Sequence, residues 1–312
     1  MDQAEGLRTA VKKNSYEMEA YLSPSDLQKD SNLIKCPRVI SVTSGKGGVG
    51  KTNVVANLAF ALTQLGEKVL VLDADLGLAN IDVLLGLTPQ FTIEHLFNRK
   101  KSFSEILVRG PGGMWILPAS SGVLDLVSLD ESQKIFLLNE LDHMAETIDI
   151  LLIDTGAGIS SNVLYFNMAA QESIVIATPE PTSMTDAYAL IKVLSNQFHK
   201  KDFMILVNLV ANVHEAKGVF KKISAVADHF LKSLSIDYLG FIPMDEKLGL
   251  AVKQQRPVLD LYPKAPSSRN FTEIAQSLLE KPPQGKDNGN VQFFWKQLFQ
   301  YHHSTKQEEG IK

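Results

Sequence analysis

The sequence predicts an α/β fold in which helices cover a doubly wound, mostly parallel β-sheet. Between residues 36 and 278, short apolar runs rich in β-branched residues alternate with helical stretches. Continuous apolar runs are typical of parallel strands buried on both faces, and repeated strand–helix alternation builds such a sheet. The expected strands are Arg38–Thr43, Lys68–Leu72, Met114–Leu117, Ile148–Ile153, Ser173–Ala177, Phe203–Val207 and Tyr238–Ile242.

The composition limits the class of protein. The chain has 312 residues, 45% of them hydrophobic, and a formal net charge of −4. These values exclude wholesale disorder and argue weakly against non-specific DNA binding. The single cysteine, Cys36, cannot form an internal disulfide or a four-cysteine metal site, and it favours a reducing compartment such as the cytoplasm. The sequence contains no apolar run of about 18 residues that would span a bilayer, and its start does not resemble a signal peptide.

The first expected strand is followed by a phosphate-binding loop, which reads Gly45-Lys46-Gly47-Gly48-Val49-Gly50-Lys51-Thr52. It matches G-x-x-x-x-G-K-[ST], with a helix expected over Asn53–Leu65 and ending at Gly66. Glycines let backbone N–H groups surround phosphate oxygens, and the helix N-terminus adds partial positive charge. We therefore expect Lys51 to reach the β- and γ-phosphates of a nucleotide and the Thr52 hydroxyl to bind Mg²⁺.

Acidic residues follow two other strands. Asp73 and Asp75 come after Lys68–Leu72, and Asp154 comes after Ile148–Ile153. The carboxyl ends of parallel strands are where α/β sheets bind ligands. An Asp after a run of apolar residues is a Walker B pattern, whose carboxylate holds Mg²⁺, often through water. The next residues, 155–158, are expected to form a switch loop that responds to the γ-phosphate through its glycines, Gly156 and Gly158.

The additional lysine of the loop, Lys46 in Lys-Gly-Gly-Val-Gly-Lys-Thr, resembles the deviant Walker A motif of the MinD/ParA ATPases. These are P-loop NTPases of the SIMIBI class. The resemblance implies an ATP-dependent homodimer in which Lys46 reaches the nucleotide of the partner subunit and stabilises its charge. A solvated loop lysine is the alternative.

The run Asp73-Ala74-Asp75-Leu76-Gly77-Leu78-Ala79-Asn80-Ile81-Asp82 resembles switch I of MinD and its flagellar relatives. It differs from the Asp-x-Asp-Pro-Gln of ParA proteins. By this resemblance Asp75 orients or activates the attacking water, Asp73 lies near the Mg²⁺ water shell, and Asn80 and Asp82 belong to the dimer-facing segment. Capping of the strand end is the alternative role for Asp75, Asn80 and Asp82.

The base-binding residues are also assigned by resemblance. Asn208 follows the strand Phe203–Val207, where the family places an asparagine that contacts adenine. The sequence there is Asn-Leu-Val-Ala and lacks the aspartate of N-K-x-D that reads guanine, which favours ATP over GTP. Pro243 and Asp245 lie in an Ile-Pro-x-Asp sequence that resembles the loop beside the base. The implied cofactors are ATP and Mg²⁺, and the implied reaction is slow hydrolysis of ATP to ADP and phosphate.

The N-terminus, Asp2-Gln3-Ala4-Glu5-Gly6-Leu7-Arg8, resembles the D-Q-A-x-x-L-R motif of the FlhG group, also called FleN or YlxH. These MinD-like ATPases set flagellar number and placement. The resemblance implies that Asp2, Gln3, Ala4, Leu7 and Arg8 dock on the SRP-type GTPase FlhF and stimulate its GTP hydrolysis, with Gln3 projecting toward the catalytic site. Further partners implied for the group are the C-ring proteins FliM/FliN or FliY and the regulator FleQ. A disordered polar start is the alternative.

The C-terminal residues predict a helix that associates with membranes. Residues 279–290 have linker composition, and residues 291–303 are dense in aromatics. At about 100° per residue, one face of a helix collects the apolar side chains, among them Phe294, Trp295, Leu298 and Phe299. Such a helix suits the boundary between acyl chains and headgroups, and MinD and FlhG proteins carry a membrane-targeting helix at this place. A helix packed on the ATPase domain is the alternative.

The sequence thus predicts an arm at 1–35, an ATPase domain at 36–278, a linker at 279–290, an amphipathic helix at 291–303 and a polar tail at 304–312. The resemblance implies an ATP-driven switch that controls flagella from the cytoplasm and the inner face of the cell membrane. A division-site MinD ATPase and a ParA-type DNA-partitioning protein are the alternatives. An electron-transfer role like that of the nitrogenase iron protein is excluded, because it needs two cluster-ligating cysteines per subunit and the sequence has only Cys36.

Overall fold

The computed structural model describes residues 37–75, 80–91, 95–96, 99–117, 147–231 and 234–281. These residues form one sheet in the order β3-β4-β2-β5-β1-β6-β7-β8. Every neighbouring pair is parallel except β3 and β4. The doubly wound, mostly parallel sheet predicted from the sequence is confirmed. The strands are β1 Arg38–Ser44, β2 Val69–Ala74, β3 Val108–Arg109, β4 Trp115–Leu117, β5 Ile150–Ala157, β6 Glu172–Ala177, β7 Asp202–Val210 and β8 Ser235–Pro243.

All seven expected strands are present, but several boundaries were wrong. β5 continues through Asp154 to Ala157, so most of the expected switch loop is strand. β7 likewise continues through Asn208 to Val210. In both cases polar or small residues end the apolar run before the ladder of backbone hydrogen bonds ends. The strand β3 was not predicted, because two residues are too few for a hydrophobic pattern.

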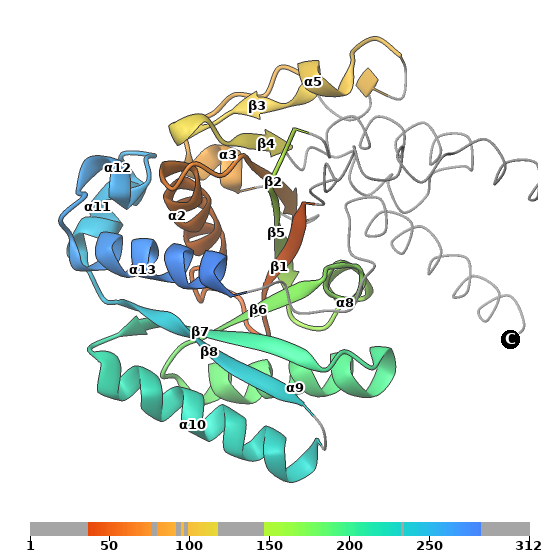
Figure 1. Ribbon diagram of the computed structural model, residues 1–312, viewed down its shortest axis with the longest axis vertical. Helices are drawn as coiled ribbons and strands as arrows, with labels where there is room; N and C mark the ends of the chain where they lie inside the picture. The colour runs from red at the N-terminus through yellow and green to blue at the C-terminus, as the bar shows by residue number, and fades with distance from the viewer. Residues whose placement is uncertain are drawn as a thin grey trace, which may run out of the picture. The chain divides into compact units, whose positions relative to one another are not determined.

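Helices cover both faces of the sheet (Figure 1). One face carries α2, α11, α12 and α13, and the other carries α8, α9 and α10. Ile174 and Ile176 of β6 pack in the first core, whereas Val175 and Ala177 pack in the second. Because successive strand side chains point to opposite faces, burial of both faces requires the continuous apolar runs. The helices are α2 Lys51–Gln64, α3 Ile81–Leu84, α5 Phe103–Ile106, α8 Ser161–Ala169, α9 Pro181–Phe198, α10 Val213–Phe230, α11 Glu246–Lys253, α12 Val258–Leu261 and α13 Pro266–Glu280, with a 3₁₀ turn η1 at Pro111–Gly113.

Helix α2 begins two residues before the predicted start at Asn53. Gly50 precedes it with φ 83°, so Lys51 and Thr52 form its first turn. The N–H groups of a first helical turn have no intrahelical partner and are available to an anion. The predicted stop at Gly66 is confirmed, since this glycine has φ 95° and its N–H donates to the Thr63 carbonyl at 3.1 Å.

The topology places a ligand site at the carboxyl end of β1. This strand lies between β5 and β6, so the chain connects to opposite sides of it, and such a switch point is where α/β sheets bind ligands. In the register, Asp154 lies beside Val42 on one side and Asp73 on the other. The phosphate-binding loop and two acidic strand ends therefore meet at one edge.

A buried ion pair lies at the amino ends of β1 and β6, opposite the predicted ligand site. Arg38 opens β1 and Glu172 opens β6, and two guanidinium nitrogens donate to the two carboxylate oxygens at 2.9 Å. Arg38 Nη1 also donates to the carbonyls of Leu278 and Lys281, at 2.6 and 3.3 Å. The pair therefore joins the first strand, β6 and the end of α13.

Two sequence predictions concern the ends of the chain. Helix α13 continues to Glu280, so residues 279 and 280 are helical and the predicted linker begins too early. The arm at 1–35, the amphipathic helix at 291–303 and the tail at 304–312 lie outside the described residues. Among the helices that the structure does describe, none has both the length and the apolar character required to cross a bilayer.

Candidate nucleotide-binding site

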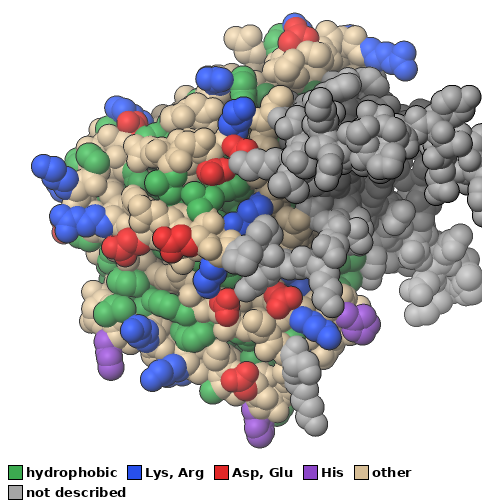
Figure 2. Space-filling model, in the orientation of Figure 1, with side chains coloured by type: hydrophobic (Ala, Val, Ile, Leu, Met, Phe, Trp, Pro, Cys, Tyr) green, Lys and Arg blue, Asp and Glu red, His purple; other side chains and the backbone are tan. Residues whose placement is uncertain are grey.

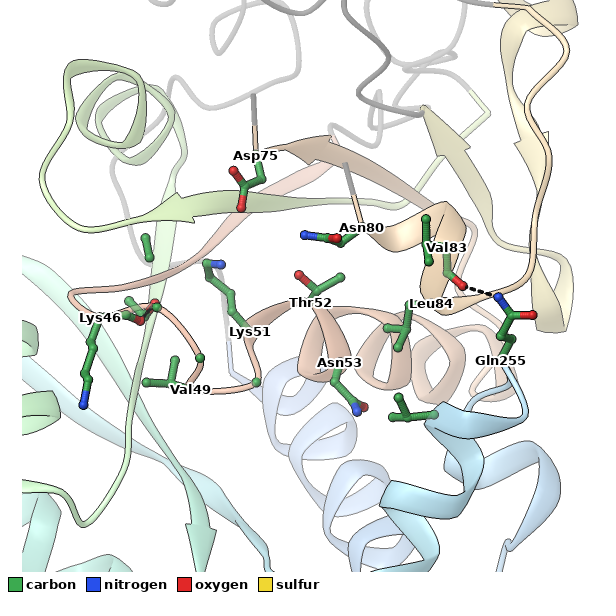
Figure 3. Close-up of a pocket in the computed structure, with 16 residues that line it drawn as sticks. Lys46, Val49, Lys51, Thr52, Asn53, Asp75, Asn80, Val83, Leu84 and Gln255 are labelled. Atoms are coloured by element: carbon green, nitrogen blue, oxygen red, sulfur yellow. Dashed lines mark hydrogen bonds between the residues drawn. The ribbon is translucent and has the colours of Figure 1, made fainter. Parts of the chain in front are cut away.

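A cavity of about 540 Å³ opens at the carboxyl ends of β1, β2 and β5. Its volume is within the range of small-molecule sites. Figure 3 shows the phosphate-binding loop on one side, Asp75 and Asn80 across from it, and Val83 and Gln255 at the far end. The lining residues are Ser44, Lys46–Asn53, Asp75, Asn80, Val83, Leu84, Ala157, Val252 and Gln255.

The phosphate-binding loop is held in shape by the protein itself. Gly48 and Gly50 have φ of 78° and 83°, a left-handed conformation that favours glycine. A side chain at Gly45 would lie 2.1 Å from the Asp186 carbonyl, so the loop passes too close to α9 for any other residue. Buried Asn208 donates its amide N–H to the carbonyl of Val49 at 2.7 Å. The loop is therefore preorganised for phosphate.

The buried carboxylate of Asp154 fits a Mg²⁺ site. Lys51 Nζ lies 3.8 Å from Asp154 Oδ1, and both side chains are at least nine-tenths buried. Neither carboxylate oxygen of Asp154 has a hydrogen-bond partner among the described residues. Buried polar atoms are nearly always paired, and hard divalent cations prefer oxygen ligands. The Asp154 carboxylate and the Thr52 hydroxyl therefore supply oxygen ligands suitable for Mg²⁺, beside the loop that would hold the phosphates.

Burial also raises the pKa of Asp154 to about 7, against a partial opposing effect from Lys51. The folded protein therefore holds this proton more tightly than the unfolded chain does. The contribution of the protonated carboxyl to the free energy of unfolding is fully present below the ordinary pKa near 3.8. It is lost as the pH rises through 7. Without metal or nucleotide, an ionised Asp154 is a source of instability.

We expect Asp154→Asn to raise the free energy of unfolding of the ligand-free protein by about 2 kcal/mol at pH 8, because it removes a buried charge that Lys51 compensates only in part. The gain should shrink as the pH falls toward 4. Urea unfolding at both pH values, without Mg²⁺ or nucleotide, measures this. A variant whose stability follows the wild type at every pH contradicts the assignment. The same variant should lose Mg²⁺-dependent stabilisation by ATP.

Asp73 has a role that its sequence position did not reveal. Its Oδ1 accepts the N–H of Asp75 at 3.1 Å, and its Oδ2 accepts those of Asn80 and Ile81 at 3.1 and 3.2 Å. Burial raises its pKa, and these hydrogen bonds oppose the rise. Asp73 thus fixes both ends of the predicted switch I run, while its place near the Mg²⁺ water shell stays a prediction.

The other predicted switch residues divide into two groups. Asp75 and Asn80 line the cavity, and Gly156 lies close to Asp75, since a side chain there would be 3.6 Å from Asp75 Oδ1. Asp82 does not line the cavity; its carboxylate accepts the N–H of Val83 at 2.8 Å. Gly158 has φ 91° and donates to the Ser44 carbonyl at 2.9 Å, joining β5 to β1 at the rim.

Lys46 points away from Lys51 and out of the cavity (Figure 3). Its Nζ donates to Glu180 Oε2 at 2.6 Å and to Thr182 Oγ1 at 3.0 Å, at the N-terminus of α9. The two side chains of the ion pair are 37% and 64% exposed. An exposed pair contributes at most about 1 kcal/mol, so this contact leaves Lys46 able to change partners.

Asn208 and Asp245, two of the residues predicted to bind the base, have other contacts in the structure. Asn208, Pro243 and Asp245 are absent from the residues that line the cavity. Asp245 caps α11 by accepting the N–H of Lys247, and it also accepts the N–H and hydroxyl of Ser267 at 3.0 and 2.6 Å. Its pKa is lowered, because these hydrogen bonds outweigh the opposing effect of burial. Contact of these three residues with adenine stays a prediction.

Sequence reasoning missed the far end of the cavity. Asn53, Val83 and Leu84 adjoin predicted motifs, but Val252 lies in α11 and Gln255 in the turn after it, about 200 residues from the loop. An amphipathic helix end carries no motif that would reveal a binding role. A small void lined by Asn53, Leu84 and Val252 shows that α11 lies beside α2 and α3, and this placement brings the residues to the site. The activator arm and the aromatic helix lie outside the described residues.

Comparison with known proteins agrees with this geometry. Residues 40–258 match the CobQ/CobB/MinD/ParA nucleotide binding domain. The antiactivator FleN of Pseudomonas aeruginosa is 42% identical over 264 residues, covering 85% of this chain and 94% of that protein. The flagellum site-determining protein YlxH of Helicobacter pylori is 32% identical, covering 85% of this chain and 90% of that protein. The solved MinD cell division protein of Aquifex aeolicus aligns with a TM-score of 0.62 and 28% identity, over 78% of this chain and 98% of that chain.

The matched domain contains every motif of the cavity, from the phosphate-binding loop to Gln255. The similarity to FleN and YlxH extends beyond it to 85% of the chain. The chain therefore belongs to the CobQ/CobB/MinD/ParA family of nucleotide-binding proteins, as a MinD/ParA-type member that resembles the flagellar proteins FleN and YlxH.

Proposed function

We propose that this protein is an ATP-dependent dimerising switch that controls the number or placement of flagella. The observation that carries the proposal is the preorganised phosphate-binding loop with an additional lysine, Lys46, whose ammonium group points away from Lys51 and contacts Glu180. FleN is by its name an antiactivator, and YlxH is by its name a flagellum site-determining protein. Similarity to these proteins favours a flagellar role over division-site placement.

The proposed reaction is hydrolysis of ATP between two subunits. Lys51 and the N–H groups of the first turn of α2 would bind the phosphates, and Thr52 and Asp154 would hold Mg²⁺, which would neutralise phosphate charge. Lys46 leaves Glu180 and reaches the nucleotide of the partner subunit. Asp75 positions the attacking water. Because both subunits contribute to each site, the dimer forms with ATP and dissociates after hydrolysis.

The proposed outputs involve the two ends of the chain. The ATP-bound dimer associates with the inner face of the cell membrane through the helix at 291–303, and two such helices per dimer bind more tightly than one. The arm at 1–35 stimulates GTP hydrolysis by FlhF, with Gln3 as the principal residue. FliM/FliN or FliY and the regulator FleQ are the further proposed partners.

Two alternatives compete with this proposal. A division-site MinD ATPase would share the switch but not the activator motif at Asp2–Arg8. A ParA-type DNA-partitioning protein is disfavoured by the net charge of −4 and by the switch I sequence. In Figure 2, acidic and basic side chains are interspersed on the visible face, without a single basic stripe among the residues described there. Absence of salt-dependent DNA binding would remove the second alternative.

Two measurements on the purified protein test the proposal. With ATP and Mg²⁺, the full chain should elute as a dimer in size-exclusion chromatography, and with ADP as a monomer. A peptide of residues 1–20 should raise the GTPase rate of FlhF, and the same peptide with Gln3→Ala should not. A chain that dimerises with ATP but has no effect on FlhF would instead support the MinD alternative.

A further inference from the structure

One hydrogen bond joins the switch I helix to a distant part of the chain at the rim of the cavity. Gln255, in the turn between α11 and α12, donates its Nε2 N–H to the carbonyl of Val83 in α3 at 2.7 Å (Figure 3). The two residues are 172 positions apart in the sequence. Both line the nucleotide cavity. Neither Gln255 nor Val83 belongs to a motif that was identified from the sequence.

The backbone around this contact is in a demanding conformation. Gln255 has φ 55°, a left-handed value that is uncommon for residues other than glycine. Gly86, which follows α3, has φ 63°, and a side chain there would lie 3.3 Å from the Cβ of Gln255. A glycine at 255 would close the same turn with less strain. Because Gln255 is itself exposed, apolar burial does not explain its presence.

Helix α3 is positioned by burial of Ile81 and the adjoining Leu85 in the core and by hydrogen bonds at its two ends. It comprises only the four residues Ile81–Leu84, far fewer than an isolated helix needs for stability. Its N-terminal end is held by Asp73, whose Oδ2 accepts the N–H groups of Asn80 and Ile81. At its C-terminal end, the Val83 carbonyl accepts from Gln255 and, at 3.3 Å, from the N–H of Gly86. Asp73 and Gln255 thus hold α3 at both ends.

We propose that Gln255 is a positioning residue for switch I. By holding the last turn of α3 at the rim of the cavity, it sets where Asn80 and Asp82 lie when the second subunit and the γ-phosphate arrive. This role rests on the proposed ATP-dependent dimer. Loss of the hydrogen bond releases α3 and slows dimerisation and hydrolysis, while the phosphate-binding loop keeps its own contacts.

Gln255→Gly separates positioning from folding. Glycine removes the side-chain donor and suits the left-handed backbone, so stability to urea should stay at or above the wild-type value. Turnover of ATP at saturation should fall about fivefold or more, because fivefold is the change expected from the loss of one hydrogen bond. The affinity for ADP should change by less than about twofold. Gln255→Glu, whose ionised carboxylate cannot donate a hydrogen bond, should lower ATP turnover by the same factor.

Gln254→Ala is the matched control. Gln254 is in the same turn and donates to the Tyr262 hydroxyl at 3.2 Å, but it does not line the cavity. Its variant should dimerise and turn over ATP at the wild-type rate. If Gln254→Ala loses as much activity as Gln255→Gly, the turn as a whole is responsible and the proposal is overturned.

Hydrogen exchange tests the contact itself, independently of ATP hydrolysis. In the nucleotide-free chain, the N–H groups of Leu84 and Leu85 donate within α3 to Asn80 and Ile81 at 2.8 and 3.1 Å. These amides should exchange about fivefold faster in Gln255→Gly than in the wild type, with α2 unchanged. Equal exchange in the two proteins overturns the proposal. If the wild type does not dimerise with ATP, the proposed function fails and this measurement alone decides the role of Gln255.

Discussion

Replacing Asp75 with alanine should lower the rate of ATP hydrolysis by about 100-fold or more, because positioned acid–base groups contribute roughly 10²–10⁴-fold. Asp75 lines the cavity opposite the phosphate-binding loop, where an attacking water would lie (Figure 3). Its side chain is not required by the proposed phosphate contacts. ATP should therefore still bind, and the ATP-bound dimer should accumulate because hydrolysis no longer dissociates it. Size-exclusion chromatography with ATP, alongside a phosphate-release assay, measures both effects.

Two lysine variants make this experiment specific. Lys51→Ala should lose nucleotide binding, and with it both hydrolysis and the dimer. Lys46→Ala should bind ATP as a monomer, because the lysine that acts on the partner subunit is missing. An Asp75→Ala protein that stays monomeric with ATP would show the catalytic assignment to be wrong. A Lys46→Ala protein that dimerises normally would remove the proposed contact across the interface.

Replacing Arg38 with alanine should lower the free energy of unfolding by about 3–5 kcal/mol, the usual cost of removing one member of a buried ion pair. The side chain of Glu172 is 1% exposed, so its charge would remain away from water. The carbonyls of Leu278 and Lys281 would lose the same guanidinium. Urea unfolding monitored by circular dichroism measures the loss.

An exposed ion pair supplies the control. Lys101 Nζ lies 2.9 Å from Glu105 Oε1, and the two side chains are 29% and 49% exposed. Lys101→Ala should therefore cost about 1 kcal/mol or less. The double change of Arg38 and Glu172 to methionine should recover part of the loss, because it removes both buried charges. A loss below about 1 kcal/mol for Arg38→Ala would mean that water reaches this pair.

The arrangement of the site was predictable where its chemistry is local in sequence. Gly45–Thr52 carries its own geometry, because left-handed glycines and the following helix N-terminus are set by neighbouring residues. Asp154 was found because an apolar run ends in an acid. By contrast, β5 and β7 continue past their apolar runs, since backbone pairing with a neighbouring strand extends a strand where side-chain pattern does not. The three predicted base-pocket residues lie outside the cavity lining, where Asp245 already caps a helix.

Local sequence was enough to predict the fold class, the phosphate-binding loop and the acids Asp73, Asp75 and Asp154 at the carboxyl ends of β2 and β5. Each depends on residues adjacent in the chain, for which short-range periodicity and backbone freedom decide the structure. Three contacts became known only from the folded chain: Asp73 holds the switch I backbone, Lys46 contacts Glu180, and Gln255 donates to α3. The contacts of Lys46 and Gln255 join residues that are far apart in the sequence. The contact of Asp73 joins its carboxylate to the backbone of Asn80, seven residues further along the chain. Packing of the helices on the sheet, which no local pattern encodes, brings them together.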